Sequence, residues 1–132
     1  MINQKRNLVL DVDGTLVPSK KSGESYADLV PFPDMIEKVR EYREAGFYII
    51  LYSARNMRTY DGNVGLINAN TAKTLMQWLD KHQIPYDEIH LGKPWPGEGG
   101  FYVDDKAIRP NEFLSLTYDE IMELVCAEES GA

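Results

Sequence analysis

The chain has 132 residues and a formal charge of −7 at pH 7. A chain of this length is expected to form one domain, spanning 1–132, that folds without a disulfide or a structural metal. The acidic balance argues against a nucleic-acid partner and against a polybasic contact with membranes. No apolar stretch approaches the roughly 20 residues of a membrane span, and no signal peptide is recognised, so a cytoplasmic protein is expected.

The first half of the chain predicts a strand, a helix and a second strand. Residues 7–11 (NLVLD) form a short apolar run of strand length. Residues 34–45 have the apolar spacing of an amphipathic helix, with Asp34 as its expected N-cap and Gly46 as its stop. Residues 47–53 (FYIILYS) are almost all apolar, which is typical of a central strand covered on both faces.

The second half continues the alternation. Residues 71–82 predict a helix whose apolar side carries Leu75, Met76, Trp78 and Leu79. Short strands are expected at 88–91 (EIHL) and at 101–103. A capping box at 117–120 predicts the start of a C-terminal helix.

This alternation predicts an α/β fold: a three-layer, Rossmann-like parallel sheet with helices on both faces. In such sheets ligands bind at the carboxyl ends of the strands. All four predicted strands are followed by residues capable of chemistry. In chain order these are Asp11 and Asp13; Ser53, Ala54 and Arg55; Lys93; and Asp104 and Asp105.

The carboxylates at this edge pose an electrostatic problem that suggests the function. Asp11 and Asp13 are two residues apart, so both are expected to face one pocket while Val12 turns to the core. With Asp104 and Asp105 added, the carboxylates cannot all stay ionised unless a cation lies among them. Oxygen ligands at this density favour Mg²⁺, which suits a site shared with a phosphate.

A metal would allow phosphoryl transfer at this pocket. Asp11 can attack phosphorus, and Asp13 can protonate the leaving oxygen and later activate water. The Ser53 hydroxyl and the Ala54 amide are expected to donate to the transferring group, and Lys93 to supply positive charge there. The sequence therefore predicts a phosphatase that forms an aspartyl-phosphate.

The same residues resemble the motifs of a known superfamily. DVDGT at 11–15, Ser53 after an apolar strand, Lys93, and VDD at 103–105 resemble the four motifs of the haloacid dehalogenase superfamily, on its phosphatase side. The stretches 52–65 and 92–110 are similar to the small phosphatases associated with capsule polysaccharide biosynthesis.

This resemblance implies roles for individual residues. Asp11 would be the nucleophile and Asp13 the acid and base. Asp11, the Asp13 carbonyl and Asp104 would hold Mg²⁺, with Asp105 in an outer position or sharing the metal. Ser53 and Lys93 would bind phosphate. A small phosphate ester, such as a sugar or polyol phosphate of polysaccharide biosynthesis, is the implied substrate.

The chain departs from the superfamily in having no room for a separate cap domain. Residues 16–33 and 54–70 are expected to be long loops, which are often functional. We expect a capless core whose substrate end is shaped by these loops or by a neighbouring subunit of a homo-oligomer. Arg55, Asn56 and Asn63 are expected to bind substrate, and Arg58 is expected to help shape this end.

Several other residues near this end have open roles. Arg58, Lys106 and Arg109 fit a positive rim for an anionic substrate, but Arg58 and Arg109 fit ordinary solvated charges equally well. Trp95, between two prolines, could stack on a sugar or stiffen its loop, and the sequence favours stiffening.

Two other functions use similar residues. The first is a nucleic-acid 3′-phosphatase, against which the charge of −7 and the lack of a Lys/Arg cluster argue. The second is a non-enzymatic phospho-acceptor domain, in which the phosphorylated aspartate follows a middle strand. Here the best nucleophile, Asp11, follows the first strand and is backed by Asp13, which favours turnover over a long-lived phosphate.

Overall fold

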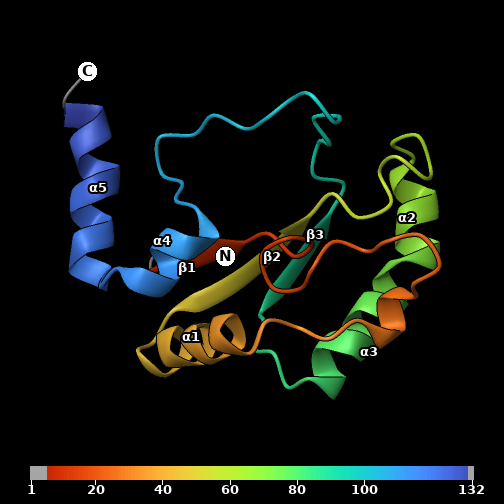
Figure 1. Cartoon of the computed structure of the whole chain (residues 1–132), viewed down its shortest axis with the longest axis horizontal. Coiled ribbons are helices and arrows are strands. Elements are labelled where there is room, and N and C mark those ends of the chain that lie inside the picture. The colour runs from red at the N-terminus through yellow and green to blue at the C-terminus, as the bar shows by residue number, and fades with distance from the viewer. Residues whose placement is uncertain (1–5, 131–132) are drawn as a thin grey trace. The chain divides into compact units, whose positions relative to one another are not determined.

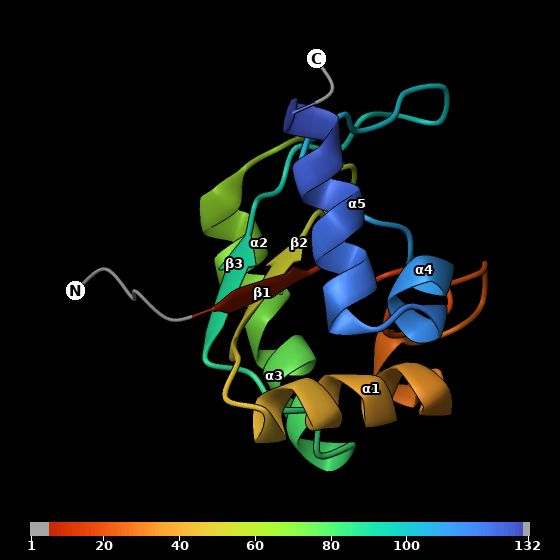
Figure 2. The same ribbon diagram turned by 90° about the vertical axis from the view of Figure 1, so that its left-hand side faces the viewer.

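A parallel three-stranded sheet organises the computed structural model, which describes residues 6–130 (Figure 1). Strands β1 (Asn7–Leu10), β2 (Tyr48–Ser53) and β3 (Glu88–Leu91) are neighbours in that order. Figure 2 shows the three strands side by side. The strands predicted from the first three apolar runs are therefore confirmed, and the second run is the central strand.

The chain divides into two compact units, one ending at Trp95 and the other beginning at Pro96, and each is described by itself. The sheet belongs entirely to the first unit. A single domain over residues 1–132 stays a prediction.

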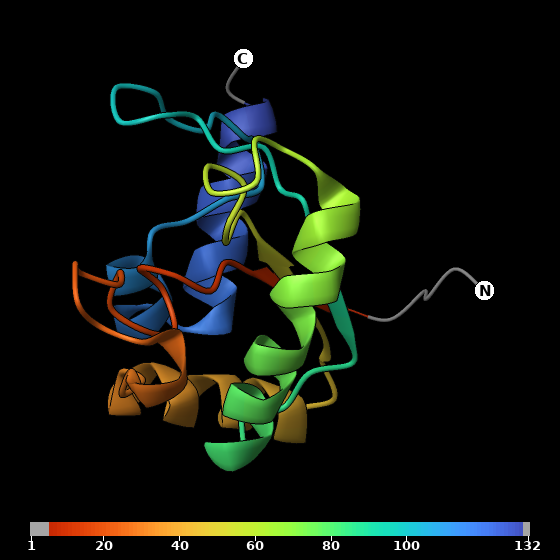
Figure 3. The same ribbon diagram turned by 90° about the vertical axis from the view of Figure 1, so that its right-hand side faces the viewer.

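The helices of the first unit fill the connections between the strands. The 3₁₀ helix η1 (Tyr26–Asp28) and helix α1 (Pro33–Glu44) lie between β1 and β2. Helices α2 (Val64–Asn70) and α3 (Ala72–Lys81) follow one another between β2 and β3, as Figure 3 shows. Helix α2 falls in a segment that was expected to be a loop, because its sequence VGLINAN carries glycine and asparagine and has little helical periodicity.

Helix α1 begins one residue earlier than expected and ends at Glu44, one residue before the expected end, while Gly46 stops it as predicted. Pro33 is its first residue, where the missing N–H costs nothing, and Phe32 is the N-cap. The prediction of Asp34 as N-cap is therefore wrong; Asp34 lies in the first turn, where its charge favours the helix dipole. Gly46 has φ +96°, the left-handed conformation that stops a helix after its C-cap.

The helices of this unit cover one face of the sheet. Right-handed crossovers that advance from β1 to β2 to β3 place α1 and α3 on the same side, as Figure 1 shows. On β2, Ile49 and Leu51 are fully buried, whereas Tyr52 is exposed. Helices on both faces stay a prediction, since the remaining helices belong to the second unit.

The core lies between this face and the helices. Predicted apolar faces supply most of it, but Met76 is exposed, so its assignment to the apolar side of α3 is wrong. Residues of the first unit that are buried in this core are Leu10, Val12, Leu16, Val17, Met35, Ile36, Val39, Tyr42, Phe47, Ile49, Leu51, Ile67, Leu75, Trp78, Leu79 and Ile84.

The second unit holds helices α4 (Pro110–Ser115) and α5 (Tyr118–Ser130). The capping box is confirmed: the Thr117 N–H donates to Glu120 Oε1 (2.9 Å), and the Glu120 N–H donates to Thr117 Oγ1 (3.2 Å). The prediction of a strand at 101–103 is wrong. This segment is irregular and exposed, and the described part of its unit contains no strand with which it could pair. None of the helices in the described residues is long and apolar enough to cross a membrane.

One hydrogen bond fixes the loop between β1 and α1 against α3. Trp78, only 2% exposed, donates its indole N–H to the Leu29 carbonyl at 2.7 Å. Leu29 directly follows η1 and is itself buried. A buried carbonyl without a partner is costly, so this bond holds the loop at a defined position.

We expect Trp78→Phe to lower the free energy of unfolding by about 1–3 kcal/mol, because the Leu29 carbonyl loses its donor while most of the apolar bulk stays. Urea unfolding of the purified variant measures the loss. Phe113→Leu, a buried apolar change without a hydrogen bond, serves as the comparison. A variant as stable as the wild type would show that the bond contributes nothing.

Asp87, just before β3, links α1 and β2 through its side chain. Its Oδ2 accepts hydrogen bonds from Arg43 Nη1 (2.7 Å) and from the Ile49 N–H (2.8 Å). Burial alone would raise the pKa of Asp87, but the bonds from Arg43 and Ile49 outweigh it and hold the pKa below its usual 3.8. The folded state therefore binds this proton less readily than the unfolded state.

The charge of Asp87 should contribute stability that is fully present above its unfolded pKa of about 3.8 and is lost as pH falls through the lower folded pKa. Asp87→Asn should cost about 1 kcal/mol at pH 7, and the difference from wild type should shrink toward pH 3. Urea unfolding at both pH values measures this. A pH-independent gap for Asp87→Asn would contradict the assignment.

Candidate active site

The carboxyl ends of the three strands bring the predicted site residues of the first unit to one edge of the sheet. Asp11 and Asp13 follow β1, Ser53 ends β2, and Lys93 comes two residues after β3. The Lys93 N–H donates to the Ser53 carbonyl at 3.1 Å, which ties the ends of β2 and β3 together. Side chains far apart in the sequence therefore share one edge.

The turn after β1 presents the two aspartates to this edge. Val12 between them is fully buried, and its carbonyl accepts the Leu16 N–H at 2.8 Å. Gly14 has φ +89°, a left-handed conformation that a residue with a Cβ rarely adopts. Gly14 of the DVDGT stretch therefore allows the backbone turn that directs Asp11 and Asp13 away from the core.

Asp11 is held by one hydroxyl and one ammonium group. Thr15 Oγ1 donates to Asp11 Oδ2 at 3.1 Å, and Lys93 Nζ lies 3.5 Å from Asp11 Oδ1. The Lys93 ammonium also lies 5.7 Å from the centre of the Tyr52 ring, within range of a cation–π contact. These contacts fix the carboxylate while leaving it 35% exposed, so it remains accessible to a ligand.

Asp13 makes a bidentate ion pair with Arg55. Arg55 Nε donates to Asp13 Oδ2 at 3.0 Å and Nη2 donates to Oδ1 at 2.8 Å. Arg55 is only 4% exposed. Such a pair is geometrically specific, because the planar guanidinium fork matches both carboxylate oxygens at once.

Tyr26 from η1 covers the guanidinium. Its ring centre lies 4.1 Å from the Arg55 guanidinium carbon. The pKa of Tyr26 is raised, chiefly by burial and further by the charge of Asp13, while Arg55 acts in the opposite direction. Sequence reasoning missed Tyr26, because a tyrosine in a polar loop carries no motif and its neighbour Arg55 lies far along the chain.

The residues predicted to bind phosphate are close to this pair. Ser53 is fully buried, and its Oγ accepts the Arg55 N–H at 3.0 Å. Ala54 is partly exposed, and its carbonyl accepts the Met57 N–H at 3.0 Å. Their role in binding phosphate stays a prediction.

The asparagines predicted to bind substrate make local hydrogen bonds. Asn56, with φ +64°, accepts from Thr71 Oγ1 at 2.7 Å and donates to Thr59 Oγ1 at 3.2 Å. Asn63 caps α2 by accepting the Leu66 N–H at 3.1 Å. Both side chains therefore shape the loop, and contact with a substrate stays a prediction.

Arg58 lies over Trp95 at the end of the first unit. The Arg58 guanidinium carbon is 5.5 Å from the Trp95 ring, which is 44% exposed. This distance is within range of a cation–π contact, so Arg58 has an aromatic neighbour as well as solvent.

Asp104 and Asp105 lie in the second unit. Asp104 Oδ1 accepts the Lys106 N–H at 2.9 Å, and this bond, with further bonds from Asp105, lowers the pKa of the Asp104 carboxyl. Both residues border a hollow of about 370 Å³ that is also lined by Val103, Ala107, Glu112, Leu124 and Val125. A metal-binding role for Asp104 and Asp105 stays a prediction.

The oxygen donors of the first unit suit a hard cation in kind, since carboxylates are what Mg²⁺ prefers. Their number is small, and both carboxylates already contact cationic side chains. Across the described residues no group of three or more His, Cys, Asp or Glu side chains is gathered as a metal centre would require.

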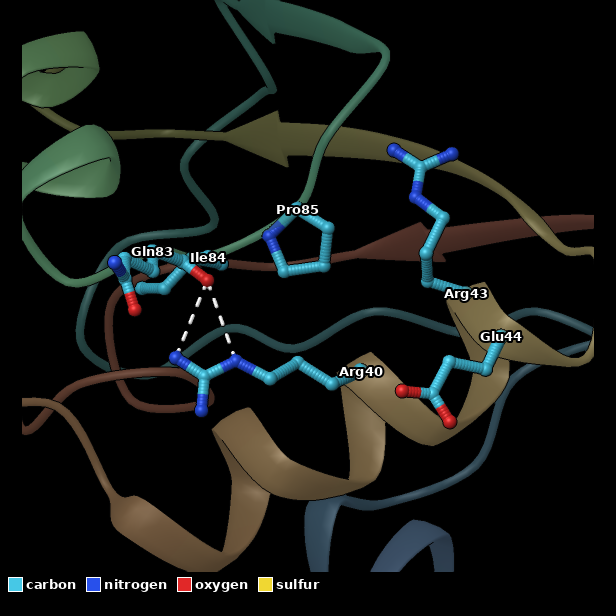
Figure 4. Close-up of a pocket in the computed structure, with 6 residues that line it drawn as sticks. All are labelled: Arg40, Arg43, Glu44, Gln83, Ile84 and Pro85. Carbon is cyan, nitrogen blue, oxygen red and sulfur yellow. Dashed lines mark hydrogen bonds between the residues drawn. The ribbon is translucent and has the colours of Figure 1, made fainter.

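A hollow at the opposite end of the strands has a different character. It has a volume of about 360 Å³ and lies between α1 and the connection from α3 to β3 (Figure 4). Arg40 donates to the Gln83 carbonyl from Nε (3.3 Å) and Nη2 (3.2 Å) and to the His82 carbonyl from Nη2 (3.0 Å). Arg40 thus satisfies backbone carbonyls at the end of α3. None of the residues that line the hollow presents a reactive group to a ligand.

Comparisons with known proteins found similar solved structures. No family model matches the sequence, and no curated protein matches it. A crystal structure of a D,D-heptose 1,7-bisphosphate phosphatase from B. bronchiseptica, complexed with magnesium and phosphate, matches with a TM-score of 0.48 and 14% identity over 72% of this chain and 54% of that one. This likeness is too weak to carry an argument.

A crystal structure of a target protein from Vibrio cholerae matches with a TM-score of 0.88 and 51% sequence identity. The match covers 94% of this chain and 99% of that chain. The chain belongs to the same family as this Vibrio cholerae protein.

Proposed function

We propose that the chain is a Mg²⁺-dependent phosphomonoesterase of the haloacid dehalogenase type. The observation that carries the proposal is the arrangement after β1. Asp11 lies at the edge of the sheet between the Thr15 hydroxyl and the Lys93 ammonium, and Asp13 follows two residues later. A carboxylate that is partly exposed and flanked by a cation suits nucleophilic attack on an anionic phosphate better than a carboxylate alone.

The proposed reaction has two halves. An oxygen of Asp11 bonds to phosphorus, the ester bond to the leaving oxygen breaks, and Asp13, which enters this step in its protonated form, gives that oxygen its proton and becomes a carboxylate. Asp13 then takes a proton from a water molecule, whose oxygen attacks the aspartyl-phosphate and releases phosphate and the Asp11 carboxylate. Lys93 opposes the negative charge that builds up at phosphorus, and Thr15 holds Asp11 in place.

Mg²⁺ would supply further positive charge at the transferring phosphoryl group. Asp11 and Asp13 are its proposed ligands in the first unit, and their oxygen chemistry fits a hard cation. A metal-binding role is also proposed for Asp104 and Asp105, on the strength of the VDD motif.

The proposed substrate is a small phosphorylated metabolite, a sugar or polyol phosphate of polysaccharide biosynthesis. Arg55, Asn56 and Asn63 belong to the loop after β2 that would shape its binding end. We further propose that the protein works in the cytoplasm and that a neighbouring subunit completes the substrate end.

Asp11→Asn should lower kcat by roughly 1,000-fold or more and Asp13→Asn by roughly 100- to 10,000-fold, because each removes a group that acts directly on the reacting atoms. The measurement is phosphate release from a panel of sugar phosphates with Mg²⁺. The exposed control Asp119→Asn should keep wild-type activity. Near-wild-type turnover by Asp11→Asn would remove the nucleophile assignment.

The same panel separates the alternatives. Activity should disappear in excess chelator and return with Mg²⁺. Preferential release from a 3′-phosphorylated oligonucleotide would indicate a nucleic-acid phosphatase instead. A stable aspartyl-phosphate without turnover would indicate a phospho-acceptor domain.

A further inference from the structure

The arginine after β2 contacts three parts of the candidate site. Its side chain holds both carboxylate oxygens of Asp13, at 3.0 and 2.8 Å. Its backbone N–H donates to Ser53 Oγ at 3.0 Å. Its guanidinium lies against the Tyr26 ring. Arg55 thus joins the loop after β1 to the end of β2.

The burial of Arg55 argues that this position has a function beyond stability. The residue is 4% exposed, and Nη1 has no hydrogen-bond partner among the described residues. A buried donor without a partner opposes folding, and such groups in folded proteins call for an explanation. Two of the three guanidinium nitrogens are used on Asp13, so the orientation of Arg55 is set by that carboxylate.

We propose that Arg55 is a positioning residue that fixes the carboxylate of Asp13, and that Tyr26 in turn fixes Arg55; the proposal rests on the phosphatase function given above. Asp13 must approach the leaving oxygen and later a water molecule at a defined angle. A carboxylate attached through the rotatable Cα–Cβ and Cβ–Cγ bonds and held only by solvent would sample several rotamers. The bidentate pair selects one of them, and the ring of Tyr26 limits the motion of the guanidinium.

Tyr26 reaches this position because its loop is anchored elsewhere. The Leu29 carbonyl, one residue after η1, accepts the Trp78 indole N–H at 2.7 Å. The chain of contacts therefore runs from α3 through the loop to Tyr26, Arg55 and Asp13. Tyr26, a loop residue outside the sequence motifs, thus helps to position Asp13, the proposed acid and base.

The test is a double-mutant cycle on kcat and KM, measured with p-nitrophenyl phosphate and Mg²⁺. Arg55→Met should lower kcat roughly 10- to 100-fold, while KM changes less than about threefold. In the Asp13→Asn background the same change should lower kcat less than about twofold, because Arg55 acts only through Asp13. Arg55→Lys should resemble Arg55→Met, since one ammonium cannot reproduce two parallel hydrogen bonds.

Tyr26 variants test the second part of the proposal, that Tyr26 fixes Arg55, while the ion pair and the fold are kept. Tyr26→Phe retains the ring and should stay within about twofold of wild type, whereas Tyr26→Leu should lower kcat roughly three- to tenfold. The control is Lys20→Met. Lys20 Nζ lies 5.5 Å from the centre of the same ring, and its side chain is not among the groups that contact Asp13, so kcat should not change.

Three results would overturn the positioning role. The first is that Arg55→Met lowers kcat by the same factor in the wild type and in the Asp13→Asn background. The second is that Arg55→Met raises KM and leaves kcat unchanged. The third is that Arg55→Lys keeps the wild-type kcat. Each of them leaves the phosphatase function standing, because the wild type is then active. A wild type that hydrolyses no phosphate ester overturns the proposed function itself and the positioning role with it.

Discussion

The ion pair between Asp13 and Arg55 is the interaction on which the candidate site depends. A chain of charge −7 places two aspartates beside each other after its first strand, and they would repel without compensation. The structure supplies a cation to each: Arg55 to Asp13 and Lys93 to Asp11. Removing one member of a buried pair leaves the other charge unsatisfied, so the two sides of the pair stabilise the edge of the sheet together.

The sheet makes this pairing available. Parallel strands carry their carboxyl ends at one edge, so residues 11–13, 53–55 and 93 become neighbours although some 40 residues separate each group from the next. Local geometry completes the arrangement. Gly14 allows the turn after β1, and the Trp78 bond anchors the loop that brings Tyr26 over Arg55. Core packing and the site are therefore linked through the same loop.

Elements with strong periodicity were predicted well, and elements without it were not. Helices α1 and α3 follow apolar patterns with helical spacing, and strands β1 to β3 are apolar runs of strand length between turn signals. Helix α2 was missed because its sequence VGLINAN carries glycine and asparagine and has little helical periodicity. The strand expected at 101–103 has the right composition, but a strand exists only with a partner, and sequence composition does not supply one.

The sequence by itself determined the α/β alternation, the aspartate pair and its turn, because strand length, helix periodicity and the need for glycine at a positive φ are local properties. It also indicated which residues follow each strand. Only the tertiary structure decided that Arg55, expected to face a substrate, is buried against Asp13, and that Tyr26 lies on its guanidinium. Those contacts join residues 13, 26 and 55, and no local pattern encodes the distance between side chains that meet only when the chain has folded.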